Sequence, residues 1–198
     1  MWIPNSKCGS RITTWNLQIP ADASLTFAPR VLLEVAFPQA DGAPPVAVSA
    51  GEQLPRNATA HPPTFSLLHP PASTGRGPFV VAMVDLDAPT PQDPSSAQIR
   101  HFLGGDFTLS VGRGGVLGLL SNSTPALSEF LQPTPPAGSD AHRYVFLLFA
   151  QPAGFAAQTV LTPATPISNF NVSLFAQEVG LGRPLGGSFM LVAPDAGA

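Results

Sequence analysis

Apolar and polar residues alternate with a period of two between residues 31 and 37 of the sequence. Val31, Leu33, Val35 and Phe37 fall on one side of this alternation. Successive side chains of a β-strand point to opposite faces, so this pattern predicts a strand with one buried face.

Two other runs, residues 79–84 and 143–149, are almost continuously apolar. Such runs are typical of strands that are covered on both faces. His101 opens a further predicted strand, and residues 187–192 predict a last one. These elements place the chain among mostly β proteins.

In residues 170–179 the apolar residues recur with the spacing of a helix that has one apolar face. Gly180 can end that helix in a left-handed conformation. Residues 38–77 are rich in Pro, Ala and Gly and predict loops with short edge strands. The glycine-rich residues 113–118 lack the Lys-Ser/Thr of a phosphate loop and predict a hairpin or crossover instead. Residues 1–29 predict an irregular N-terminal arm.

The composition supports one ordered domain over residues 1–198. Hydrophobic residues make up 44 % of the 198 residues and charged residues 11 %, which excludes a disordered chain. The 24 prolines and 18 glycines predict many turns and ordered loops. We therefore expect a β-rich domain with few helices.

Charge and cysteine content exclude several classes of function. The net charge is −3, Lys7 is the only lysine and the arginines are scattered, so nucleic acid is not an expected partner. Cys8 is the single cysteine, which excludes an intrachain disulfide and a cysteine-based zinc site. Its place in the N-terminal segment does not favour a catalytic role. No apolar run reaches the roughly 18 residues that a transmembrane helix needs.

Three glycosylation sequons begin at Asn57, Asn122 and Asn171. They predict a secreted glycoprotein, although residues 1–10 lack the pattern of a signal peptide. The alternative is a cytoplasmic protein with accidental sequons.

Polar side chains gather at the predicted ends of the buried strands. Asp85 and Asp87 end one strand, His142 and Tyr144 begin another, and His101 opens a third. Residues two apart on a strand share a face, and buried polar groups need partners, so we expect one shared pocket. The carboxylates would orient the imidazoles, and the imidazoles and the phenol would donate to an anion.

Other uses of these residues remain open at this point. Aspartates beside Pro89 often cap turns, and a tyrosine at the start of a strand often packs in the core. Two aspartates and two histidines can also bind a metal, but the sequence has no closely spaced histidine pair. We expect neither a metal nor a cofactor.

These motifs resemble those of phosphatidylethanolamine-binding proteins. The resemblance lies in Asp-Leu-Asp-Ala-Pro at 85–89, Arg-His-Phe-Leu at 100–103, the Pro-Pro-Ala-Gly loop ending at Gly138, His-Arg-Tyr at 142–144 and the C-terminal residues 170–189. Similar segments run in order from about residue 31 to residue 192. The Ala- and Pro-rich composition is similar to that of fungal members.

The resemblance implies an antiparallel β-sandwich with a few peripheral helices and a shallow anion pocket at one end. It assigns ligand binding to the following residues: Asp85, Asp87, Pro89, His101, Pro135, His142 and Tyr144. It also implies a cis peptide bond between Ala88 and Pro89.

Three residues depart from the family pattern. Leu86 replaces a proline between the aspartates, and Gln132 stands where glycine is usual, so its side chain is expected to narrow the pocket or add an amide donor. Arg100 occupies a position that is usually aromatic or apolar, which suggests a ligand other than a phospholipid head group.

Three functions are compatible with the resemblance. The first is a binding protein for a small ligand that carries phosphate or carboxylate. The second is an enzyme or enzyme helper that assists cyclisation or dimerisation of an anhydride or carboxylate intermediate in a fungal polyketide pathway, with Asp85 or Asp87 and His101 or His142 as a proton-transfer pair. The third is an inhibitor of a serine carboxypeptidase or another protein partner. No serine nucleophile is positioned by the sequence, so a Ser-His-Asp hydrolase is not expected.

Overall fold

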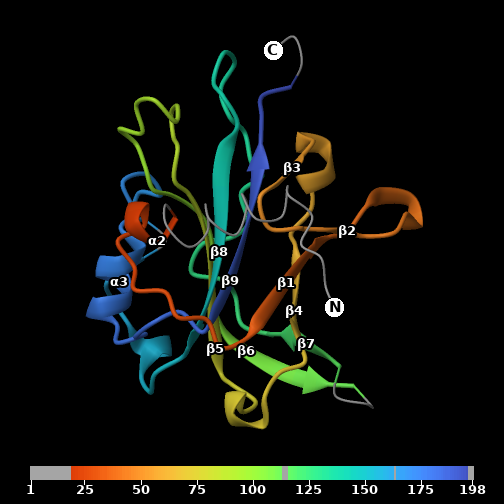
Figure 1. Ribbon diagram of the computed structural model, residues 1–198. Helices are drawn as coiled ribbons and strands as arrows, with labels where there is room; N and C mark the ends of the chain where they lie inside the picture. Colours follow the sequence, from red (N-terminus) through yellow and green to blue (C-terminus); the bar gives the residue numbers. More distant parts are fainter. Residues whose placement is uncertain (1–18, 113–115, 163, 196–198) are drawn as a thin grey trace.

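A curled mixed sheet of nine strands forms the described part of the chain (Figure 1). The computed structural model describes residues 19–112, 116–162 and 164–195. The strands are β1 (Leu32–Phe37), β2 (Val46–Ala47), β3 (Glu52–Leu54), β4 (Thr64–Leu68), β5 (Phe79–Asp85), β6 (Ile99–Val111), β7 (Leu117–Ser121), β8 (His142–Ala150) and β9 (Gly186–Val192). The helices are α2 (Ile19–Asp22) and α3 (Val172–Glu178), with short 3-10 turns η1 (Ala40–Gly42), η2 (Arg56–Thr59), η3 (Ala72–Thr74) and η4 (Phe155–Ala157).

The strand order is β2-β1-β4-β7-β6-β5-β8-β9-β3. The long strand β6 belongs to both halves of the sheet, because its first part pairs with β5 and its last part with β7. The predicted mostly β fold is confirmed, and the two facing halves correspond to a sandwich. The strands pair antiparallel as expected, except that β3 pairs with β9 in parallel.

Two hydrophobic cores lie on opposite faces of β5 and β8. The inner core lies between the halves of the sheet and includes Val35, Phe37, Leu67, Phe79, Val81, Met83, Tyr144, Phe146, Leu148 and Met190. The outer core lies under α2 and α3 and includes Ile19, Val80, Ala82, Val84, Leu86, Val145, Leu147, Phe149, Phe170 and Phe175. Figure 1 shows both helices on the same side of β8 and β9, away from β1 and β4.

The apolar patterns explain these strands. β1 buries alternate residues as predicted, and every residue of β5 is buried, as expected for a strand covered on both faces. The C-terminal helix α3 begins after Asn171, whose Oδ1 accepts a hydrogen bond from the Leu174 N–H at 2.8 Å. Gly180 has φ +74°, and the Leu181 N–H donates to the Ala176 carbonyl, which confirms the predicted left-handed helix end.

Two expectations about loops are wrong in part. β2 and β3 are edge strands as predicted, but β4 lies between β1 and β7 inside the sheet. The residues expected to form an irregular arm include α2, with Ile19 and Ala23 buried in the outer core. Apolar side chains at these two positions fill the space under the sheet, so this part of the arm packs as core. Residues 1–18 lie outside the described residues.

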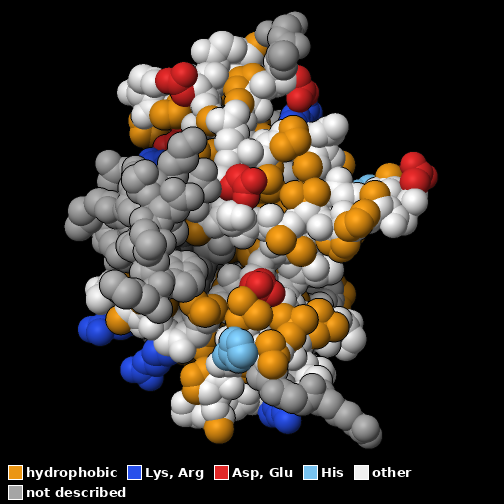
Figure 2. All heavy atoms as spheres, turned by 45° about the vertical axis from the view of Figure 1, so that its right-hand side comes forward, with side chains coloured by type: hydrophobic (Ala, Val, Ile, Leu, Met, Phe, Trp, Pro, Cys, Tyr) orange, Lys and Arg blue, Asp and Glu red, His pale blue; other side chains and the backbone are white. Residues whose placement is uncertain are grey.

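Hydrophobic side chains gather on the face that β1, β4 and β7 turn outward (Figure 2). Leu32 is 65 % exposed, and Val116, Leu117 and Leu119 are also exposed. Within the described residues, no helix has both the length and the apolar character required to cross a bilayer.

Candidate functional site

Three neighbouring strands bring the predicted polar side chains to one end of the sheet. β5 runs antiparallel to both β6 and β8, so its last residue, Asp85, lies beside the first residues of those strands. In the register of the sheet, Asp85 is opposite Tyr144 on β8 and Ile99 on β6. The structure therefore brings together Asp85, His101, His142 and Tyr144.

A β-bulge directs His101 toward this cluster. Phe102 pairs with Met83 and Arg100 pairs with Val84, which leaves His101 without an opposite residue on β5. The extra residue of a bulge changes which face a side chain reaches. The His101 ring consequently packs edge-on against Tyr144, with 5.0 Å between ring centroids.

Asp85, His142 and Ser139 form a continuous chain of hydrogen bonds. The Nδ1 of His142 lies 2.9 Å from Asp85 Oδ2, and its Nε2 lies 2.9 Å from Ser139 Oγ. The other carboxylate oxygen of Asp85 accepts a hydrogen bond from the Asp87 backbone N–H at 2.8 Å. A carboxylate only accepts hydrogen bonds, so the Nδ1 of His142 carries a proton.

His101 is fixed by the chain at Leu131. Its Nδ1–H donates to the Leu131 carbonyl at 2.8 Å, and the Leu131 N–H donates to the His101 carbonyl. Burial lowers the pKa of His101 and outweighs the hydrogen bond to Leu131 and the charge of Asp85, which raise it, while the charge of His142 adds the smallest contribution, a lowering. Within the described residues, the Nε2 of His101 has no hydrogen-bond partner, and this nitrogen is the one available to a ligand.

The Tyr144 ring packs against both imidazole rings, edge-on with His101 and stacked with His142. Its ring stacks on His142 at 6.4 Å between centroids and is 1 % exposed. Burial raises the pKa of Tyr144, and the Asp85 carboxylate raises it further. The phenol is therefore a neutral hydroxyl group throughout the physiological pH range.

Asp87 does not join the histidines, which corrects the prediction of one shared orientation for the two aspartates. Its carboxylate accepts hydrogen bonds from the Arg143 backbone N–H at 2.7 Å and from the Arg143 guanidinium, with Nη2 at 2.6 Å. β5 ends at Asp85, so the alternation of a strand does not continue through Leu86 to Asp87. Asp87 and Arg143 lie on the helix-covered face, whereas Asp85 and His142 lie on the inner face.

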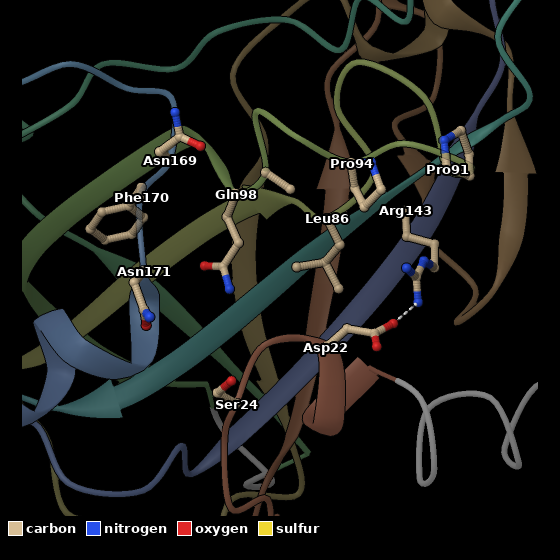
Figure 3. A pocket seen from close by; sticks show the side chains of 11 residues that line it. Asp22, Ser24, Leu86, Pro91, Pro94, Gln98, Arg143, Asn169, Phe170 and Asn171 are labelled. Carbon is tan, nitrogen blue, oxygen red and sulfur yellow. Dashed lines mark hydrogen bonds and ion pairs between the residues drawn. The ribbon is translucent and has the colours of Figure 1, made fainter.

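A hollow on the helix-covered face is lined by Arg143 (Figure 3). It has a volume of about 530 Å³, and its polar lining includes Asp22, Gln98, Asn169 and Asn171. The Arg143 guanidinium is bound by both Asp87 and Asp22, and these hydrogen bonds raise its pKa. One arginine between two carboxylates leaves a net negative charge, so this hollow does not favour an anion.

The two prolines assigned to ligand binding differ in exposure. The Ala88–Pro89 peptide bond is cis, as predicted, and Pro89 is exposed. Pro135 is buried in the loop before β8. The same loop contains Gln132, whose Nε2 donates to the Arg56 carbonyl at 2.9 Å. Its amide is thus used within the protein, which corrects the expectation that it adds a donor to the pocket.

Arg100 also has a structural role that the sequence did not predict. Arg100 precedes the bulge and His101 occupies it, so their side chains point to different faces of the sheet. Arg100 donates to the Ser128 hydroxyl and to the Thr165 carbonyl, and its guanidinium lies 5.0 Å from the Phe170 ring centroid. Arg100 therefore anchors loops on the outer core.

The remaining candidate residues lie outside this cluster. Asn57, Asn122 and Asn171 are exposed, as a glycosylated asparagine must be. Cys8 lies outside the described residues. Within the described residues, no three His, Cys, Asp or Glu side chains converge on a possible metal position.

Ser139 is the residue of the site that sequence reasoning missed. Gly138 has φ +81°, and the Ser139 N–H donates to the Pro136 carbonyl, so a tight turn brings Ser139 back under His142. The Pro-Pro-Ala-Gly sequence predicts a turn but not the atom that the turn presents. A serine three residues before a histidine has no spacing that marks it as a partner.

Comparison with known proteins identifies the family of this chain. The family model described as phosphatidylethanolamine-binding protein matches residues 45–190. The chain is 30 % identical over 181 residues to phomoidride biosynthesis cluster protein N of the fungus Talaromyces stipitatus, covering 84 % of this chain and 87 % of that protein. It is 26 % identical over 147 residues to a 26 kDa secreted antigen of Toxocara canis, covering 73 % of this chain and about half (51 %) of the antigen.

Solved structures show the same fold. A carboxypeptidase Y inhibitor, in complex with its cognate proteinase, superposes with a TM-score of 0.70 at 24 % identity, covering 94 % of this chain and 96 % of that one. Phosphatidylethanolamine-binding protein from Plasmodium vivax superposes with a TM-score of 0.63 at 13 % identity, covering 93 % and 97 %. The chain belongs to the phosphatidylethanolamine-binding protein family.

Proposed function

We propose that this protein binds a small oxyanion, a carboxylate or a phosphate, at Asp85, His101, His142 and Tyr144. The observation that carries the proposal is the hydrogen bond from His101 Nδ1–H to the Leu131 carbonyl. It fixes the ring so that Nε2 is the nitrogen left for a ligand. When His101 is protonated, that nitrogen becomes a donor to an oxyanion.

The charge of the cluster makes this binding depend on protonation. With both imidazoles neutral, the cluster carries the negative charge of Asp85, which repels an anion. Protonation of one imidazole cancels that charge, and protonation of the second makes the cluster positive. Because burial lowers the pKa of His101, affinity should increase as pH falls through a value below 6.5.

Burial limits the size of the group that binds. The side chains of the four residues are at most 4 % exposed, so any opening onto them is narrow. The Ser139 hydroxyl is hydrogen-bonded to the Nε2 of His142, so an anion that binds this nitrogen has to replace the hydroxyl. We therefore expect the oxyanion to enter while the rest of the ligand stays at the surface.

A biosynthetic role is the second candidate. The relative from Talaromyces stipitatus belongs by name to a biosynthesis cluster and aligns over most of both chains. This supports a ligand that is a carboxylate or anhydride intermediate, with the Asp85–His142 pair transferring a proton during its cyclisation or dimerisation. The likeness to the carboxypeptidase Y inhibitor concerns the fold, and inhibition of a protein partner stays a prediction.

Calorimetry with three ligands tests the proposal. Phosphate, phosphorylethanolamine and a dicarboxylate would be titrated into the protein at pH 5.5 and pH 7.5. Binding that is tighter at the lower pH and weakened in His101→Ala supports the proposal, and a preference for the dicarboxylate favours the biosynthetic role. His61→Ala, which removes an exposed histidine outside the cluster, is the matched control. Absence of binding by all three ligands at both pH values overturns the proposal.

A further inference from the structure

The hydrogen-bond chain from Asp85 through His142 to Ser139 has the connectivity of an activated serine nucleophile. Both contacts are 2.9 Å long, one at each nitrogen of the ring. The carboxylate requires the proton on Nδ1, so the neutral ring presents the lone pair of Nε2 to the serine hydroxyl. This is the tautomer in which a histidine acts as general base for a serine.

The burial of the three groups fits these roles. Asp85 is 3 % exposed and His142 is 1 % exposed, which shields the hydrogen bond between them from water. Ser139 is half-buried and lies in the loop before β8, nearer to solvent than the other two groups. The Asp87 N–H holds the second oxygen of Asp85, which fixes the orientation of the carboxylate.

The serine hydroxyl has two acceptors for one proton. Its oxygen lies 2.9 Å from the Asp140 carbonyl and 2.9 Å from His142 Nε2. With neutral His142, the hydroxyl can donate to Nε2 and be activated. With protonated His142, Nε2–H donates to Ser139 Oγ, and the hydroxyl proton turns to the Asp140 carbonyl. Protonation of His142, whose ring faces Asp85, Tyr144 and the neighbouring His101, therefore switches the nucleophile off.

We propose that Ser139 is an acyl-accepting nucleophile with His142 as its base, for carboxyl groups activated as anhydrides or aryl esters. This inference rests on the proposed oxyanion site, because the acid that is released carries the carboxylate the site would bind. Activated acyl groups are the expected class, since their leaving groups depart as stable anions and need less assistance than an amine.

The reaction proceeds in two balanced steps. Ser139 Oγ bonds to the acyl carbon while its proton passes to His142 Nε2, and the bond from the acyl carbon to the leaving group breaks with the electron pair on that group. His142 passes this proton to bulk water as the leaving group departs. Water then attacks the acyl-serine with His142, neutral again, as base, and the bond from the acyl carbon to Ser139 Oγ breaks. The acid is released, and the proton on His142 restores the Ser139 hydroxyl.

Reaction with p-nitrophenyl acetate tests this assignment. Release of p-nitrophenolate is followed by absorbance, and peptide mass mapping locates the acetyl group. We expect acetylation of Ser139, a rate that falls on acidification, and a loss of about 100-fold in His142→Gln, the lower range for removal of a general base. Ser95→Ala, which removes an exposed hydroxyl elsewhere, should react like the natural chain.

Two variants separate this inference from the oxyanion proposal. Ser139→Ala should lose acetylation at this position while retaining phosphate or dicarboxylate binding, and Ser139→Cys should be labelled at a rate that still depends on His142. Acetylation elsewhere at an equal rate in Ser139→Ala overturns the inference. So does labelling of Ser139→Cys that is indifferent to His142→Gln. Acetylation of Ser139 without any oxyanion binding would reject only the binding proposal.

Discussion

Asp87 holds Arg143 at two points, through the backbone N–H at 2.7 Å and through the guanidinium Nη2 at 2.6 Å. The carboxylate is 1 % exposed, and the guanidinium also binds the more exposed Asp22. Asp85 and Asp87 thus bind successive residues of β8 on opposite faces of the sheet. Asp85 binds His142, and Asp87 binds Arg143.

The first prediction concerns this ion pair. Asp87→Ala leaves Arg143 without its buried partner and should lower the free energy of unfolding by about 3–5 kcal/mol. Asp22→Ala removes the partner whose side chain is 48 % exposed and should cost less than about 1 kcal/mol. Urea unfolding of both variants measures the difference. Equal losses in the two variants would contradict the assignment of the stability to Asp87.

The second prediction concerns stability and pH. Burial lowers the pKa of His101 in the folded protein below the 6.5 of the unfolded chain. Between these two values the unfolded state binds more protons, so the free energy of unfolding should fall as pH decreases below about 6.5 and level off below the folded value.

His101→Gln tests the direction of this pH dependence, because a glutamine side chain does not titrate. The difference in unfolding free energy between the natural chain and this variant should change between pH 7.5 and pH 5, to the relative disadvantage of the natural chain at low pH. His61→Gln, at an exposed histidine, should change it little. A flat difference for His101→Gln would show that the protonation of His101 is not coupled to folding.

The third prediction concerns the strength of the oxyanion contacts. His101→Ala and His142→Ala should each weaken phosphate or dicarboxylate binding at low pH by about 1.5–3 kcal/mol, the range for hydrogen bonds to charged groups. The double variant should lose less than the sum, because both imidazoles would contact one ligand. Calorimetric titration of the four proteins gives the coupling. Full additivity would argue against a shared ligand.

The fourth prediction concerns secretion and glycosylation. If the chain passes through a eukaryotic secretory pathway, Asn57 should carry glycan, since it is exposed. Asn122 is also exposed and should carry glycan, with its remaining Nδ2–H left for the Gly105 carbonyl, to which this nitrogen donates at 2.8 Å. Asn171 is compatible with glycan because its Oδ1 caps α3 and its amide nitrogen faces no described acceptor. Intact mass before and after glycosidase treatment of natively produced protein is the measurement. An unchanged mass would favour the cytoplasmic alternative.

The sequence predicted well which strand ends come together, because this depends on where strands begin and end. Asp85 follows an apolar run and His142 precedes one, and antiparallel pairing brings such ends together. Apolar runs mark the strands that the hydrophobic cores bury, so these strands can be recognised in the sequence. The same reasoning explains why β1, β5, β8 and β9 were predicted within one or two residues.

The details that the sequence could not predict depend on local irregularities. The bulge at His101 reverses the face expected from simple alternation, and the end of β5 turns Asp87 toward Arg143. Ser139 reaches His142 only through the turn at Gly138. Each of these involves one residue of extra length or one backbone angle, which neither composition nor periodicity encodes.

The placement of the two cores on opposite faces of β5 and β8 has an evolutionary consequence. Neighbouring positions such as Met83 and Val84 contribute to different cores, so a substitution in one need not be compensated in the other. The segments that cover the outer face, α2 and α3, can therefore change while the packing of the inner face, where Asp85 and His142 lie, stays the same.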